Sequence, residues 1–122
     1  QTALFEIKGL SKEQCCYVLQ SVMWQMDEFE NWGSTGINQS SRDVSQIFDI
    51  SHKKVVMPLL FAALMGKIHG PPLFDSVEIL GKDRTRARLL NAIEFLGGIS
   101  NKRMHLLKKS WGEKQAQHLM KE

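Results

Sequence analysis

The sequence has little cysteine, proline or tyrosine. It contains two cysteines, three prolines and one tyrosine in 122 residues. The cysteines, Cys15 and Cys16, are adjacent, and neighbours on a helix project about 100° apart, so they cannot easily form a disulfide. No second cysteine pair and no His or acidic cluster lies at metal-ligand spacing. We therefore predict reduced core thiols, with no metal site and no catalytic residue.

Long apolar runs and alternating runs are also missing. The longest apolar segment, residues 55–66, is interrupted by Pro58 and is shorter than the roughly 20 residues that a membrane span needs. No signal peptide is evident, and no alternating apolar and polar run has the length of a strand. These absences favour a cytoplasmic, all-α protein with no membrane association. A chain of this length can bury one core, so we expect a compact bundle or cage of five to six short helices, or two small packed subdomains.

The N-terminal third carries the signals of one amphipathic helix. Ser11 and Gln14 have the spacing of a capping box, in which each side chain bonds the other residue's backbone N–H. Apolar residues then recur at steps of three and four, which predicts a buried face on a helix ending near Trp32. Residues 33–41 are rich in Gly, Ser and Asn, and we predict a flexible loop that joins two subdomains.

Proline and glycine divide the middle of the chain into further helices. A short helix is expected from Ser41 to Asp49. Pro58 suits the first position of the next helix, and Gly66 is placed to end it. Pro71 and Pro72 start a helix that a left-handed Gly81 should end, and another follows at once from residue 82 to residue 96. Ser100 is expected to cap a basic C-terminal helix whose buried residues are Met104, Leu107 and Trp111.

This order of residues resembles the anticodon-binding domain of bacterial glutamyl-tRNA synthetases. The pattern of that family runs Pro-Leu-Arg-x-Ala-Leu-Thr-Gly, then a link containing Gly-Pro, then Leu-Leu-Gly-Lys-Glu and Arg-Leu. About forty residues match closely, the match is weaker back to Ser40, and none is evident before it or after Gly97. The matching residues are Leu60, Ala63, Leu64, Gly66, Gly70, Pro71, Ile79, Leu80, Gly81, Lys82, Arg88 and Leu89.

Two positions depart from the family pattern. Phe61 stands where the family has an arginine that contacts the anticodon, and Met65 stands where it has threonine. Phe61 is therefore either a residue that stacks on an unpaired base or, as is more usual for Phe, a core residue. The family also places basic anticodon contacts near Arg42, whose alternative role is an exposed ion pair with Asp43 or Asp49.

The resemblance implies further RNA contacts. It assigns base contact to the link formed by Gly70, Pro71, Pro72 and Leu73, where small and rigid residues let the backbone approach a splayed base. Arg84 and Arg88 lie four residues apart on one side of a helix that also carries Lys82, and their guanidinium groups suit phosphate oxygens. Phosphate contacts position an RNA without reading its sequence.

Charge is distributed unevenly along the chain although its net value is only +3. Residues 1–50 hold three basic and seven acidic residues, whereas residues 51–122 hold thirteen basic and six acidic residues. This asymmetry favours an anionic partner for the second part, although a solvated helical surface would look the same.

The resemblance implies that the chain recognises the anticodon of tRNA(Glu), with tRNA(Gln) left open, as the C-terminal part of a glutamyl-tRNA synthetase. The signatures His-x-Gly-His and Lys-x-x-Lys-Ser are absent and the chain is too short for a synthetase, so ATP, glutamate and magnesium are expected in a separate catalytic domain. We expect a monomer divided into a helix and linker (1–39), an anticodon-binding cage (40–96) and a basic helical extension (97–122).

Two alternatives remain. A helical protein-interaction module of a synthetase or translation complex is favoured if Trp24 and Trp32 are exposed. A DNA-binding helix-turn-helix around Gly81 is disfavoured, since no Asn or Gln pair is present to read adenine.

Overall fold

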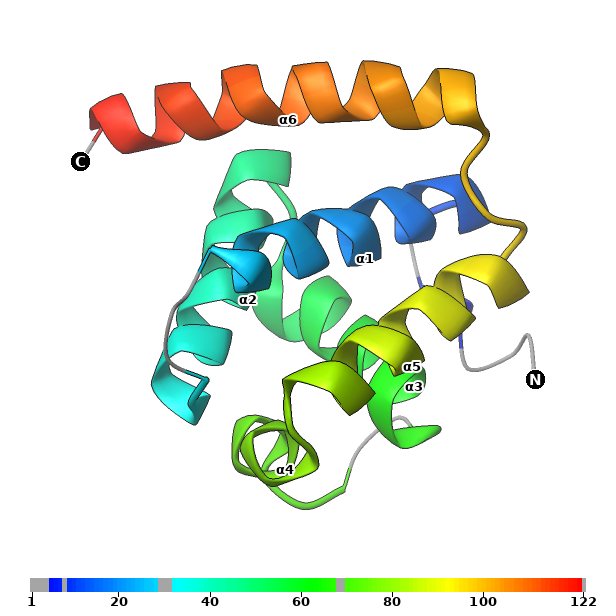
Figure 1. The fold of residues 1–122 in the computed structure, drawn as a ribbon, viewed down its shortest axis with the longest axis vertical. Coiled ribbons are helices and arrows are strands. Elements are labelled where there is room, and N and C mark those ends of the chain that lie inside the picture. The colour runs from blue at the N-terminus through cyan, green and yellow to red at the C-terminus, as the bar shows by residue number, and fades with distance from the viewer. Residues whose placement is uncertain (1–4, 8, 29–31, 68–69, 122) are drawn as a thin grey trace.

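The described residues of the chain form six α-helices and one short π-helical turn (Figure 1). This computed structural model describes residues 5–7, 9–28, 32–67 and 70–121, with only the backbone of residue 121. Within those ranges no strand occurs, which confirms the predicted all-α class. The elements are α1 (Lys12–Asp27), α2 (Ser34–Phe48), η2 (His52–Val56), α3 (Met57–Met65), α4 (Leu73–Leu80), α5 (Lys82–Phe95) and α6 (Asn101–Lys121).

The first helix begins as predicted. The Ser11 hydroxyl accepts from the Gln14 N–H at 3.1 Å, and the Gln14 side chain accepts from the Ser11 N–H at 2.8 Å. Together these bonds satisfy two N–H groups that the first turn leaves open. Both cysteines are fully buried on this helix. Helix α1 ends at Asp27, earlier than predicted, and Trp32 donates from Nε1 to the Val77 carbonyl oxygen at 3.2 Å on α4.

The predicted loop at residues 33–41 is wrong, because helix α2 already begins at Ser34. Glu78 of α4 accepts from the Ser34 N–H at 3.2 Å, and Ile37 is buried. The Ser40 hydroxyl donates to the Gly36 carbonyl within the helix. These residues form helices poorly alone, so packing and a cap from a distant helix decide their conformation. Helix α2 runs through the predicted boundary between residues 39 and 40.

The segment around α3 follows the predicted glycine and proline signals, with one addition. Pro58 lies in the first turn of α3, and Gly66 ends it with φ 66° and ψ 24°, a left-handed conformation. The π-helical turn η2 precedes α3 and was not predicted. Gly81 differs from the predicted left-handed cap, because φ 90° and ψ 160° place it in a region that is essentially restricted to glycine. That conformation turns the chain directly from α4 into α5.

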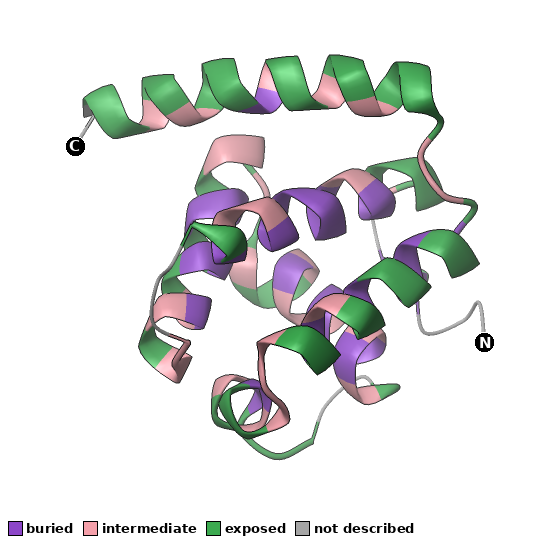
Figure 2. Cartoon of the chain, viewed as in Figure 1, coloured by how far each residue is buried: buried purple, intermediate pink, exposed green. Residues whose placement is uncertain are grey.

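The last helix packs across one end of the molecule. In Figure 1, α6 crosses above α1 and the end of α2, on the far side from α4. The Ser100 hydroxyl accepts from the Arg103 N–H at 3.2 Å, as predicted. Figure 2 shows that α6 is mostly exposed whereas α1 is mostly buried. Trp111 is the buried anchor of α6, while Met104 and Leu107 are half-buried.

Candidate nucleic-acid interface

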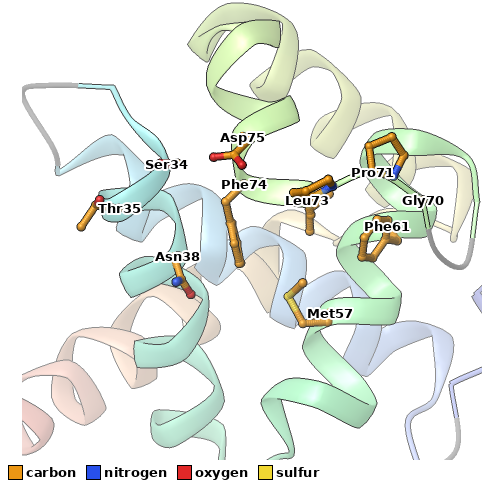
Figure 3. Close-up of a pocket in the computed structure, with 11 residues that line it drawn as sticks. Ser34, Thr35, Asn38, Met57, Phe61, Gly70, Pro71, Leu73, Phe74 and Asp75 are labelled. Atoms are coloured by element: carbon orange, nitrogen blue, oxygen red, sulfur yellow. The ribbon is translucent and has the colours of Figure 1, made fainter.

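A pocket of about 480 Å³ opens between α2, α3 and α4 (Figure 3). The start of α2 forms one wall, α3 forms the opposite wall, and the link before α4 closes one end. Its lining residues are Ser34, Thr35, Asn38, Met57, Phe61, Gly70, Pro71, Pro72, Leu73, Phe74 and Asp75.

This pocket brings together five of the predicted site residues. Phe61 comes from α3, and Gly70, Pro71, Pro72 and Leu73 come from the link and the start of α4. Phe61 is half-buried, so one part of its ring packs on the core and another part faces the pocket. Gly70, Pro71 and Pro72 are exposed, as a backbone that approaches a base must be. Residues 68 and 69 lie outside the described residues.

Leu73 occupies a different environment from the rest of the link. Only 3% of its surface is exposed, so the side chain belongs to the core beneath the link. A substitution of Leu73 would therefore disturb packing. Phe74, the next residue, stacks on the His52 ring with centroids 6.4 Å apart and planes at 15°.

Sequence reasoning missed the α2 wall of the pocket. Thr35 and Asn38 were assigned to a loop, so their alignment with α3 was not foreseen. Phe74 and Asp75 were also missed, although both directly follow the predicted link. A glycine at position 33 followed by Ser34 was the available signal for a helix start, but that signal is weak without Glu78.

The pocket carries little charge. Among its described lining residues only Asp75 is ionisable, and its carboxylate would repel a phosphate group. Asn38 accepts from the Nε of Arg42 at 3.0 Å, which leaves the amide NH₂ of Asn38 available as a donor. Burial, and to a lesser extent the nearby Arg42 charge, lower the pKa of His52, which favours the neutral imidazole. These groups suit an uncharged ring with polar edges.

None of the predicted basic residues is among the described residues that line the pocket, and only Arg42 bonds a residue that does. Arg42 is exposed and bonds Asn38, so neither Asp43 nor Asp49 is its partner. Lys82 is half-buried, whereas Arg84 is exposed and has no hydrogen-bond or ion-pair partner within the described ranges. Arg88 donates from Nη1 to the Leu64 carbonyl oxygen at 2.6 Å and so satisfies the C-terminal end of α3.

Arg86 has a structural role instead. Its guanidinium forms two hydrogen bonds to the Asp27 carboxylate at 2.8 and 2.9 Å and joins α5 to the end of α1. The same bonds lower the pKa of Asp27 and raise that of Arg86. Arg86 is therefore engaged within the fold.

The described part of the chain forms neither a metal-ligand cluster nor a membrane-spanning helix. No group of three or more His, Cys, Asp or Glu side chains there is arranged to hold a metal ion. No helix among the described residues is long and apolar enough to span a bilayer.

A family model described as the anticodon binding domain matches residues 1–93. The chain belongs to the anticodon-binding domain family. The predicted family is thus confirmed, and the match starts at residue 1, well before the forty residues in which the sequence resemblance was evident. Helix α6, which begins at Asn101, lies beyond the part that the anticodon-binding domain model matches.

Similar proteins show the same relationship. The chain is 64% identical over 118 residues to a glutamate–tRNA ligase of Protochlamydia amoebophila, which covers 97% of this chain and 24% of that protein. It is 44% identical over 93 residues to a glutamate–tRNA ligase of Chlamydia abortus, covering 76% of this chain and 18% of that protein. The chain therefore spans about a quarter or less of the length of the curated relatives it matches.

Proposed function

We propose that this chain recognises the anticodon end of tRNA(Glu) as part of a glutamate–tRNA ligase. The family implies a tRNA partner, and the names of the similar proteins support tRNA(Glu). The observation that carries the proposal is the pocket, because it collects Phe61 and the exposed link of Gly70, Pro71 and Pro72 into one concave surface.

In the proposed complex, one unpaired base enters the pocket. The Phe61 ring offers an aromatic surface for stacking, and the exposed backbone of the link can approach the base closely. Asp75 and the Asn38 amide provide an acceptor and a donor for the polar edges of the base. Since Phe61 replaces the family's arginine, the choice between tRNA(Glu) and tRNA(Gln) falls to these groups.

Arg42, Lys82, Arg84 and Arg88 would bind phosphate groups of the same tRNA. Arg84 and Arg42 are exposed and suit this role directly, whereas Arg88 also holds the end of α3. Such contacts add affinity to any tRNA and make binding sensitive to salt.

The catalytic steps of the ligase would take place outside this chain. We propose that ATP, glutamate and magnesium bind to parts of the ligase outside this chain, whose own residues contribute no catalytic group. The chain would act in the cytoplasm, as a monomer, and bind neither DNA nor membranes.

The test is a titration of this chain with tRNA(Glu) and with the same tRNA carrying a swapped anticodon. We expect clearly weaker binding of the swapped tRNA, measured by fluorescence anisotropy at fixed salt. Equal affinity for both RNAs would contradict anticodon reading.

The protein-interaction alternative loses its main support. It would be favoured by exposed Trp24 and Trp32 side chains, but both are half-buried and pack against the core. If the chain presented a large apolar surface to a partner protein, these two side chains would be expected on that surface.

A further inference from the structure

The first half of α6 has a charge pattern that helix stability does not explain. Residues 101–110 include Lys102, Arg103, Lys108 and Lys109 and no acidic residue. The first turn of a helix favours acidic side chains because the N-terminal end of the helix dipole is positive. Two cations in this turn, with no acid there, oppose the dipole. Residues that violate local sequence preferences of this kind are expected at functional or strained sites.

Three of these residues point to one side of the helix. Lys102, His105 and Lys109 are spaced at i, i+3 and i+7, so they lie above one another on a single face, here called the α6 basic face. All three are exposed, and none has a hydrogen-bond or ion-pair partner among the residues that the structure describes. Lys108 lies exposed beside this face.

The opposite side of α6 is fixed to the rest of the protein. Trp111 stacks on Phe48 with ring centroids 6.1 Å apart and planes at 22°. The amide of Gln115 donates to the Gln25 side chain at 2.8 Å. Arg103 pairs with Glu13 near the start of the helix. Because contacts occur along α6, the helix holds the α6 basic face outward as a fixed row.

We propose that the α6 basic face binds the phosphate backbone of the tRNA, at a second contact area away from the pocket. This inference rests on the proposed tRNA-binding function. Helix α2 links the two areas, since Asn38 lines the pocket and Phe48 lies under Trp111. Its 15 residues extend about 22 Å at 1.5 Å each, and the width of α6 adds about 10 Å, a span that one folded RNA can cover.

The composition of this face selects RNA over an acidic protein. Protein interfaces gain most of their affinity from apolar and aromatic anchors at their centre. Leu106 is the one exposed large apolar side chain in the described first half of α6. Lysines on an exposed helix are instead suited to phosphates, which they attract without reading sequence.

The test measures tRNA binding of the double variant Lys102→Gln/Lys109→Gln. Binding of tRNA(Glu) and of an anticodon-swapped tRNA is followed between about 50 and 200 mM salt. We expect both affinities to fall about 3- to 10-fold, with an unchanged ratio between the two RNAs, and the slope of log affinity against log salt to decrease by about 1.5.

A matched control removes the same charge elsewhere. Lys53 and Lys54 are exposed on η2, and Lys53→Gln/Lys54→Gln should stay within about twofold of the parent protein. Equal losses from both double variants would assign the effect to net charge and overturn the inference, as would an unchanged salt slope in the α6 variant. Lys102→Arg/Lys109→Arg should retain binding, and matching melting curves would show that every variant folds.

The two proposals fail in different ways. Equal affinity of the parent protein for tRNA(Glu) and for the anticodon-swapped tRNA would contradict anticodon reading. The α6 inference would then still be tested by the salt slope of the Lys102→Gln/Lys109→Gln variant. A parent chain that binds no tRNA would overturn both.

Discussion

Phe61 and Leu73 line the same pocket, yet their exposure gives them different tasks. Leu73 is sealed beneath the link, so it supports the pocket through packing. Phe61 is half-buried and keeps part of its ring available. Substitution at these two residues should therefore separate stability from RNA recognition.

Leu73→Ala should lower the free energy of unfolding by about 2–5 kcal/mol, because it removes a buried side chain and leaves a cavity. Urea denaturation measures this change. The control is Ile79→Ala on the same helix, where 86% of the side chain is exposed and a change within about 0.5 kcal/mol is expected. A loss at Leu73 as small as that at Ile79 would show that the link is not anchored in the core.

Phe61→Ala should weaken binding of tRNA(Glu) by about 5-fold or more, since stacking of one base on an aromatic ring contributes about 1–3 kcal/mol. Phe61→Tyr keeps the aromatic face and should bind nearly as well as the parent protein. Anisotropy titrations at constant salt provide the comparison. If Phe61→Tyr and Phe61→Ala lose affinity equally, the ring does not stack on RNA.

Arg84 and Arg88 should differ although both are predicted to bind phosphate. Arg84→Ala should reduce affinity for all tRNAs to a similar extent and leave stability unchanged, because its side chain is exposed. Arg88→Ala should also cost about 1 kcal/mol of stability through loss of its bond to the Leu64 carbonyl. Salt-dependent titration together with urea denaturation separates these effects; identical stability of the two variants would contradict the assignment.

At the scale of elements, distant contacts decide where helices lie. Helix α2 starts at Ser34 because Glu78 from α4 caps it and Ile37 enters the core. Helix α6 stays on the molecule through Trp111, which stacks on Phe48 at the end of α2. The cap and the stacked pair join segments that are well separated in the sequence.

Trp111→Ala should loosen α6 more than it destabilises the rest of the fold. The indole is buried at 5% exposure and anchors a helix that is otherwise largely exposed, so α6 amides should exchange hydrogen faster than those of α1. Hydrogen exchange followed by mass spectrometry resolves the two helices. Leu106→Ala, at a position that is 56% exposed, is the control and should leave exchange unchanged. Equal acceleration in α1 and α6 would show that Trp111 supports the whole core.

At the scale of the whole molecule, the core keeps the Cys15 thiol protonated. Burial, with a smaller contribution from Cys16, raises the pKa of Cys15 from 9.0 to about 11. In the unfolded chain the thiol ionises near 9.0, while in the folded chain it keeps its proton until about pH 11. The unfolded state therefore binds fewer protons in this window, and folding stability must fall as pH rises through it.

Urea denaturation between pH 8 and pH 11 should show this decline, and Cys15→Ala should show a smaller one because the ionising thiol is gone. Below the pKa of the unfolded chain the contribution of Cys15 to stability is constant. The unfolding free energies of the parent protein and of Cys15→Ala should therefore change with pH in the same way there. The same decline in both proteins would mean that other groups set the pH dependence.

The sequence alone determined those features that depend on neighbouring residues. The capping box at Ser11, the place of Pro58 in the first turn of α3, the end of α3 at Gly66 and the cap at Ser100 are local hydrogen-bond or dihedral effects, and each was predicted. The family was also readable from residues near Gly70 and Gly81, because it is carried by a short ordered pattern.

Only the tertiary structure decided which segments meet. The loop expected at residues 33–41 is helical because Glu78 and the core reach it, and the pocket exists because α2 then stands opposite α3. Leu73 is buried while Pro72 is exposed, although both belong to the same predicted link. A local pattern cannot report such differences, since burial and distant caps depend on the whole chain having folded.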